Sequence, residues 1–173
     1  MGTLAEFNGL AAGAAERELA ACNAAPRFAR EVAAGRPYPS VPALADTAAT
    51  VAGGLDWDEV AAALAAHPRI GERAAGGSAE AASSRREQSA VTAAGDEVKR
   101  ALADGNRAYE RRFGHVFLIR AAGRGPDEIL AELTRRLGND PATERAETTA
   151  QLAEITRLRV ERMVDPLSRR SGR

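Results

Sequence analysis

The side chains best suited to chemistry lie between His67 and Gln88. His67 is one of only two histidines in this chain of 173 residues, and Ser84, Glu87 and Gln88 follow it. Spacings of three and four residues place the last three side chains on one face of a helix. That face would offer a hydroxyl, a carboxylate and an amide to a polar ligand, and the imidazole could move a proton. Function is therefore expected to reside in this stretch.

Local sequence also predicts where His67 lies. Residues 60–66 form an apolar helical run, and Pro68 disfavours helical geometry at the residue before it. We therefore expect the imidazole at a helix C-terminus, facing a turn. The negative end of the helix dipole favours the protonated ring there, whereas burial favours the neutral one. On these grounds alone, a capping or hydrogen-bonding role for His67 is more common than catalysis.

Composition favours a helical fold. Hydrophobic residues make up 45% of the chain but aromatic residues only 4%, and alanine is abundant, which favours closely packed helices over a sheet. The length suits one domain with a sizeable core. We predict an all-α fold, a single-domain compact bundle of about eight helices with one short extended segment near residues 115–120. This domain is assigned to residues 1–166, and residues 167–173 form a basic tail that is expected to be disordered.

Capping residues and glycines predict several element boundaries. Ser40 and Asp56 are candidate N-caps, and a long helical pattern over residues 96–113 ends before Gly114. Arg36 stands beside two prolines and is expected to tie its loop to neighbouring carbonyls rather than to bind a ligand.

Two features in the C-terminal half of the sequence could have either a structural or a ligand-binding role. Backbone N–H groups from Ile119 to Gly123 could point at an anionic or carbonyl ligand, although one glycine-rich turn is weak support for a site. Arg159 follows the apolar stripe of the last predicted helix, residues 141–164, and composition alone predicts a solvated arginine.

Several motifs, in the same order, resemble those of a known family. They are Arg36-Pro37-Tyr38-x-Ser40, His67-Pro68-x-Ile70-Gly71, Ser84-x-x-Glu87-Gln88, Asn106-x-x-Tyr109-x-x-x-Phe113-Gly114, Arg136-Leu137-x-Asn139 and Ile155-x-x-Leu158-Arg159. This set resembles the OHCU decarboxylases of urate breakdown, where OHCU is 2-oxo-4-hydroxy-4-carboxy-5-ureidoimidazoline. The resemblance covers roughly residues 4–165. His115 departs from it, since the family more often has an apolar or aromatic residue after Phe-Gly.

The resemblance implies a reaction and a set of site residues. The reaction is loss of CO2 from OHCU to give (S)-allantoin in urate catabolism, without a metal or organic cofactor. His67 would transfer the proton, Glu87 and Gln88 would hold the ring and ureido groups, and a homodimer is expected because the family is commonly dimeric. The expected catalytic residues are His67, Glu87 and Arg159, and the expected substrate-binding residues are Pro68, Ser84, Arg85, Arg86, Glu87, Gln88, Ile119, Arg120, Ala121, Ala122 and Gly123.

Charge and cysteine content narrow the possible partners and compartments. The chain has 24 basic and 24 acidic side chains, so no bulk charge attracts nucleic acid or an anionic membrane. Cys22 is the only cysteine, which excludes an intrachain disulfide. No apolar segment is long enough for a signal peptide or a membrane span. A small-molecule substrate or a second copy of the chain is the expected partner, and the cytoplasm is the expected compartment.

Two other classes of function stay open. A metal hydrolase would need several ligands at workable spacing, and His67, His115 and scattered carboxylates do not form a recognisable set. A non-catalytic helical dimerisation or interaction domain is the better rival, because alanine-rich amphipathic helices also form dimer surfaces. That rival predicts that replacing His67 leaves the biological role intact.

Overall fold

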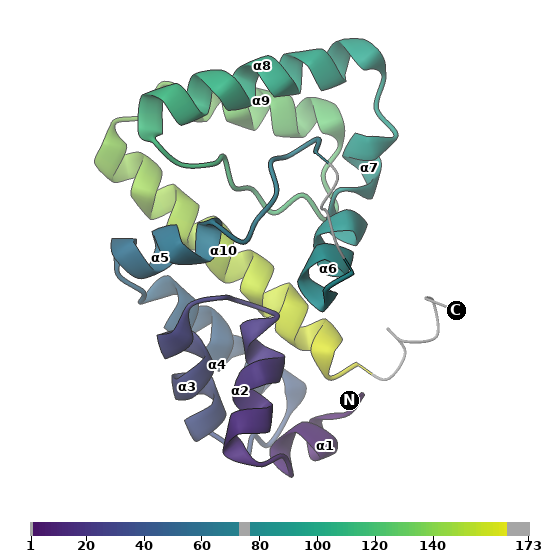
Figure 1. Cartoon of the computed structure of the whole chain (residues 1–173), viewed down its shortest axis with the longest axis vertical. Helices are drawn as coiled ribbons and strands as arrows, with labels where there is room; N and C mark the ends of the chain where they lie inside the picture. Colours follow the sequence, from purple (N-terminus) through teal and green to yellow (C-terminus); the bar gives the residue numbers. More distant parts are fainter. Residues whose placement is uncertain (1, 73–76, 166–173) are drawn as a thin grey trace. The chain divides into compact units, whose positions relative to one another are not determined.

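The computed structural model describes residues 2–72 and 77–165, which form ten α-helices and no strand (Figure 1). This confirms the all-α class. Ten helices were found where about eight were expected, because short helices such as α1 and α7 offer too few residues for helical periodicity to be recognised. The helices are α1 (Leu4–Asn8), α2 (Ala12–Ala20), α3 (Pro26–Ala34), α4 (Val41–Gly53), α5 (Trp57–Leu64), α6 (Ala79–Glu87), α7 (Ser89–Thr92), α8 (Asp96–Phe113), α9 (Pro126–Arg136) and α10 (Pro141–Met163).

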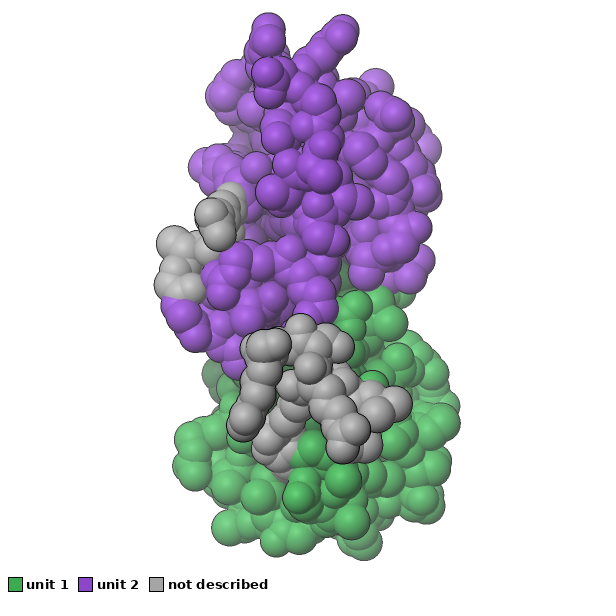
Figure 2. Space-filling view, turned by 90° about the vertical axis from the view of Figure 1, so that its right-hand side faces the viewer, with its two compact units in different colours: residues 1–60, 152–173 green, residues 61–151 purple. Residues whose placement is uncertain are grey.

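The chain divides into two compact units, which Figure 2 shows in green and purple. Unit 1 comprises residues 1–60 and 152–173, and unit 2 comprises residues 61–151. The boundaries fall within α5 and α10, so both helices contribute residues to each unit. The predicted tail, residues 167–173, lies outside the described residues.

Several predicted boundaries agree with the observed capping contacts. Ser40 caps α4, because its Oγ accepts a hydrogen bond from the N–H of Ala43 (3.2 Å). Asp56 caps α5 in the same way, through Oδ1 and the N–H of Glu59 (3.0 Å). These contacts satisfy N–H groups that have no partner within the helix.

Unit 1 is built on helices α1 to α4. Its core includes Phe7, Phe28 and Leu44, each 0% exposed. Arg36 holds the loop between α3 and α4, since its Nη1 donates to the carbonyls of Phe7 (3.0 Å) and Leu10 (2.7 Å). This confirms the structural role predicted for Arg36.

In unit 2, helices α8 and α9 lie side by side (Figure 1). Helix α8 ends at Gly114, whose φ of +77° is a left-handed conformation that glycine adopts without steric cost. The N–H of Gly114 donates to the carbonyl of Glu110 (2.9 Å). The unit's core contains Ile70, Val91, Leu102, Tyr109, Phe117, Ile119, Ala121, Ile129 and Leu133.

The segment after Gly114 lies in this core and is not helical. Phe117, Leu118 and Ile119 are 2–4% exposed. The apolar run that suggested an extended segment is therefore buried against helices and pairs with no other strand in residues 2–72 and 77–165.

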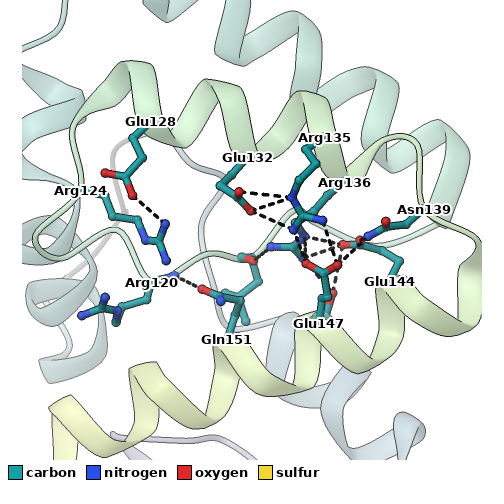
Figure 3. A network of polar contacts seen from close by, with 12 residues as sticks. Arg120, Arg124, Glu128, Glu132, Arg135, Arg136, Asn139, Glu144, Glu147 and Gln151 are labelled. Atoms are coloured by element: carbon teal, nitrogen blue, oxygen red, sulfur yellow. Dashed lines mark hydrogen bonds and ion pairs between the residues drawn. The ribbon is translucent and has the colours of Figure 1, made fainter.

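A buried polar network holds that segment (Figure 3). Arg136 of α9 is 1% exposed and donates to the Leu118 carbonyl through Nη1 (2.7 Å). The same guanidinium binds Glu144 of α10, which is 0% exposed, at 2.5 and 2.9 Å. Gln151 of α10 accepts the backbone N–H of Arg120 through Oε1 (2.8 Å). The segment is thus fixed to both α9 and the N-terminal part of α10.

Candidate active site

His67 lies in the turn that follows α5. The helix ends at Leu64, two residues before the end of the predicted run. Beyond it the backbone hydrogen bonds join residues three apart instead of four, and the His67 N–H donates to the Leu64 carbonyl (2.9 Å). His67 is 9% exposed. His67 was expected at the helix C-terminus, facing a turn; it lies three residues beyond the end of α5, in the turn itself.

Helix α6 carries the second group of predicted residues. Ser78 caps its start by accepting from the N–H of Ala81 (3.1 Å). Ser84 is 3% exposed and Gln88 8%, whereas Glu87 is half-buried. Gln88 is the C-cap, and its N–H donates to the Ser84 carbonyl (3.1 Å). Arg85 and Arg86 occupy the last turn of the same helix, half-buried and exposed respectively.

Hydrogen bonds join the His67 turn to the second group and to α8. The N–H of Gly71 donates to Oε1 of Gln88 (3.0 Å). Nδ2 of Asn106, on α8, donates to the carbonyl of Ile70 (2.8 Å). The side-chain oxygen of Gln88, one of the predicted ligand-binding groups, is thus engaged by the backbone of Gly71. One of the two acceptor positions of this oxygen is therefore occupied within the protein. Asn106 belonged to a motif but had not been given a site role.

Residues 119–123 form the third part of the predicted site. Ile119 and Ala121 are buried, Arg120 and Ala122 are half-buried, and Gly123 is exposed with φ of +80°. The backbone N–H of Arg120 already donates to Gln151, so it is not one of the N–H groups available to a ligand.

Arg159 is the one predicted site residue in unit 1; the others belong to unit 2. It lies on α10 and is 3% exposed. The solvated arginine expected from composition alone is therefore wrong. A guanidinium is buried at such depth only when surrounding groups offset its lost hydration.

His115 belongs to an aromatic cluster in unit 2. Its ring centroid lies 5.4 Å from that of Tyr109, at an interplanar angle of 79°, and its Nδ1 is 3.0 Å from the Val116 carbonyl. Burial lowers the pKa of His115 below its ordinary value of 6.5, despite opposing contributions from the Val116 carbonyl and Glu144. His115 is thus a half-buried histidine packed in an aromatic cluster.

This environment predicts a pH dependence of stability. Because the pKa of His115 is lower in the folded protein than in the unfolded chain, the unfolded chain binds more protons below about pH 6.5. The free energy of unfolding should therefore fall between about pH 7 and pH 5, and fall less in His115→Phe. Denaturant unfolding of both proteins at the two pH values measures this. Carboxylates contribute equally in both, so an unchanged slope in His115→Phe would contradict the prediction.

The described residues show neither a metal-ion site nor a membrane-spanning helix. In residues 2–72 and 77–165, no three or more His, Cys, Asp or Glu side chains are grouped as a metal ion would require. In the same ranges, no helix combines the length and apolarity needed to cross a membrane.

Comparisons with known proteins agree on one family. The OHCU decarboxylase family profile matches residues 8–161. A 2-oxo-4-hydroxy-4-carboxy-5-ureidoimidazoline decarboxylase from Amia calva is 39% identical over 59 residues, which are 34% of each chain. The uric acid degradation bifunctional protein TTL from Arabidopsis thaliana is 30% identical over 154 residues, 86% of this chain and 47% of that protein. The matches thus span about a third and about half of these two relatives.

Two solved structures share the fold. A crystal structure of OHCU decarboxylase in the presence of (S)-allantoin superposes with a TM-score of 0.70 at 25% identity, covering 83% of this chain and 94% of the other. A crystal structure of (S)-allantoin synthase gives a TM-score of 0.69 at 16% identity, covering 94% of this chain and 54% of the other. The second likeness concerns the fold alone.

Proposed function

The chain belongs to the OHCU decarboxylase family, and we propose that it converts OHCU to (S)-allantoin and CO2 in urate breakdown. The observation that carries the proposal is the hydrogen bond between the Gly71 N–H and Gln88 Oε1. It ties the turn after His67 to the end of α6, next to Glu87, where His67, Ser84 and Gln88 are all at most 9% exposed.

The proposed chemistry needs three things from the protein. The bond between the ring carbon and the carboxylate breaks, CO2 leaves, and the electron pair passes into the conjugated ring. A proton is then added to that carbon on one face. The protein must bind a polar ring, stabilise the transition state more than the substrate, and deliver the proton from one side.

The site residues divide these tasks. We assign the proton transfer to His67. Glu87 would accept hydrogen bonds from ring and ureido N–H groups, and the Gln88 amino group would donate to a carbonyl or carboxylate oxygen. Ser84 would supply a further hydrogen bond. Because His67, Ser84 and Gln88 are buried, water would screen their contacts with the substrate only weakly.

Arg159 has a distinct proposed role. Its positive charge could orient the substrate carboxylate or stabilise charge that develops as CO2 departs. If Arg159 bound that carboxylate too tightly, it would stabilise the bound substrate more than the transition state and slow the reaction. The family resemblance is what supports a role for Arg159 in the reaction, and both of these roles remain part of the proposal.

Circular dichroism of freshly generated OHCU tests the proposal. OHCU is formed in place from urate, and allantoin formation is followed with and without the wild-type protein. Optically active allantoin should form faster than in the spontaneous reaction. If product formation with the protein matches the slow racemic background, the decarboxylase proposal fails and the helical interaction domain becomes the better explanation.

We further propose that the active species is a cytoplasmic homodimer. The family resemblance supports the dimer, and the zero net charge supports a small-molecule substrate rather than a nucleic acid. Light scattering coupled to size-exclusion chromatography measures the oligomeric state, and a mass of one chain at working concentrations would contradict the dimer.

A further inference from the structure

One peptide group in the turn after His67 is held at both ends. The carbonyl of Ile70 accepts from Asn106 Nδ2 (2.8 Å), and the N–H of Gly71 donates to Gln88 Oε1 (3.0 Å). This carbonyl and this N–H belong to the same peptide bond. Because a peptide group is planar, two hydrogen bonds on opposite sides fix the orientation of the whole plane. We refer to this pair of hydrogen bonds as the peptide clamp.

The surroundings of the peptide clamp make it hard to replace by water. Ile70 is 5% exposed, Asn106 3% and Gln88 8%. Polar contacts in such surroundings are stronger than in water, and broken ones are costly. Gly71 has φ of +89°, so the chain turns sharply at the clamped peptide.

Helix α8 holds the same turn at a second point. Arg69 forms a bidentate ion pair with Glu110: its Nε donates to Oε1 (2.5 Å) and its Nη2 donates to Oε2 (2.9 Å). Glu110 is four residues after Asn106, and therefore on the same face of α8. The Arg69 side chain is 46% exposed and that of Glu110 25%, so solvent weakens this ion pair. Asn106 is the buried anchor and Glu110 the exposed one.

The bonding of Asn106 is not optimal for stability. Its Oδ1 is buried and, among the residues that the structure describes, has no hydrogen-bond partner. A buried acceptor without a partner destabilises the folded state. Asn106 therefore holds the turn while leaving one of its own polar atoms unsatisfied, a departure from ideal packing of the kind found at functional sites.

We infer that Asn106 is a positioning residue for the proposed decarboxylation, on which this inference rests. Its clamp lies three residues after His67 and joins the residue directly after Glu87. Pro68 restricts the backbone between His67 and the clamp. Asn106 thereby holds the imidazole and the Glu87 carboxylate at a set separation across the substrate. Misplacement of a reacting group by about 1 Å can cost about 10²-fold in rate.

The test compares Asn106→Ala and Asn106→Asp with Glu110→Gln. Asn106→Ala cannot donate to the Ile70 carbonyl, and Asn106→Asp cannot do so while its carboxyl group is ionised. Glu110→Gln weakens the exposed anchor and leaves the peptide clamp intact. We expect kcat to fall about 10- to 100-fold in the Asn106 variants, with a much smaller change in KM. The excess of (S)-allantoin should also fall, measured at enzyme concentrations that make the spontaneous reaction negligible. Glu110→Gln should keep kcat within about twofold.

Hydrogen exchange gives a readout that does not depend on activity. The amide of Gly71 should exchange faster in Asn106→Ala than in wild type, because the peptide plane is no longer held at its carbonyl. A residue with a merely structural role would lower the thermal midpoint but leave kcat per folded molecule and the product's optical purity unchanged. If the Asn106 variants keep kcat and optical purity, or if Gly71 exchanges equally fast in both proteins, while wild type is active, the inference is overturned.

A wild type without activity would instead overturn the proposed function. If Asn106→Asp does not fold, Asn106→Ala decides the outcome.

Discussion

Replacement of His67 by alanine is expected to lower kcat for OHCU decarboxylation by about 10²- to 10⁴-fold, the usual range for loss of a positioned proton donor. His67 is buried in the turn that the Gly71–Gln88 hydrogen bond ties to α6. An alanine side chain carries no group that could transfer a proton. The product that still forms should have lower optical purity, because protonation would no longer come from one side.

Initial rates from circular dichroism measure this effect, and the chain supplies a matched control. His115 is the only other histidine, and His115→Phe should retain kcat within a few-fold of wild type because we assign His115 no catalytic role. Thermal unfolding of each variant confirms that the folded protein is being assayed. A His67→Ala protein with wild-type kcat and wild-type optical purity would rule out His67 as the proton donor.

Replacement of Glu144 by alanine is expected to destabilise the protein by about 3–5 kcal/mol, the cost of leaving a buried charge without its partner. Arg136 and Glu144 are 1% and 0% exposed. Glu144 also accepts from the hydroxyl of Tyr109, and Asn139 donates to its second oxygen (2.8 Å). Since domains are stable by only about 5–15 kcal/mol, this single change could remove much of the total.

Denaturant unfolding measures the loss, with the neighbouring arginine as control. Arg135 lies beside Arg136 on α9, but its side chain is 50% exposed and pairs with Glu132 and Glu147 near the surface. Arg135→Ala should cost about 0–1 kcal/mol. Equal losses in Glu144→Ala and Arg135→Ala would show that burial does not set the strength of these ion pairs.

The Glu144 replacement should also affect the candidate site. Arg136 donates to the carbonyl of Leu118, directly before Ile119 in the segment that the family resemblance assigns to substrate binding. Without its hydrogen bonds to Glu144, the Arg136 side chain would be held less firmly in that orientation. Activity per folded molecule is therefore expected to fall together with stability in Glu144→Ala, and to stay near wild type in Arg135→Ala.

Features set by near neighbours in the chain were predicted from the sequence. The N-caps Ser40 and Asp56, the extent of α8 and its end at Gly114 depend on contacts within about four residues. The same is true of the helical spacing that places Ser84 and Gln88 together on α6. Such local features can be predicted without knowing which helices pack against one another.

The long-range contacts were decided only by the tertiary structure. The contact of Asn106 with Ile70 spans 36 residues, and that of Gly71 with Gln88 spans 17. Neither pairing follows from periodicity or capping, because it depends on how α8 and α6 pack around the turn. The burial of Arg159 likewise changed the interpretation drawn from composition, since the exposure of a side chain is a property of packed helices. By itself, the sequence determined the helical class and proposed the residue types of the candidate site. Packing decided how deeply each of these residues is buried and which hydrogen bonds its atoms form.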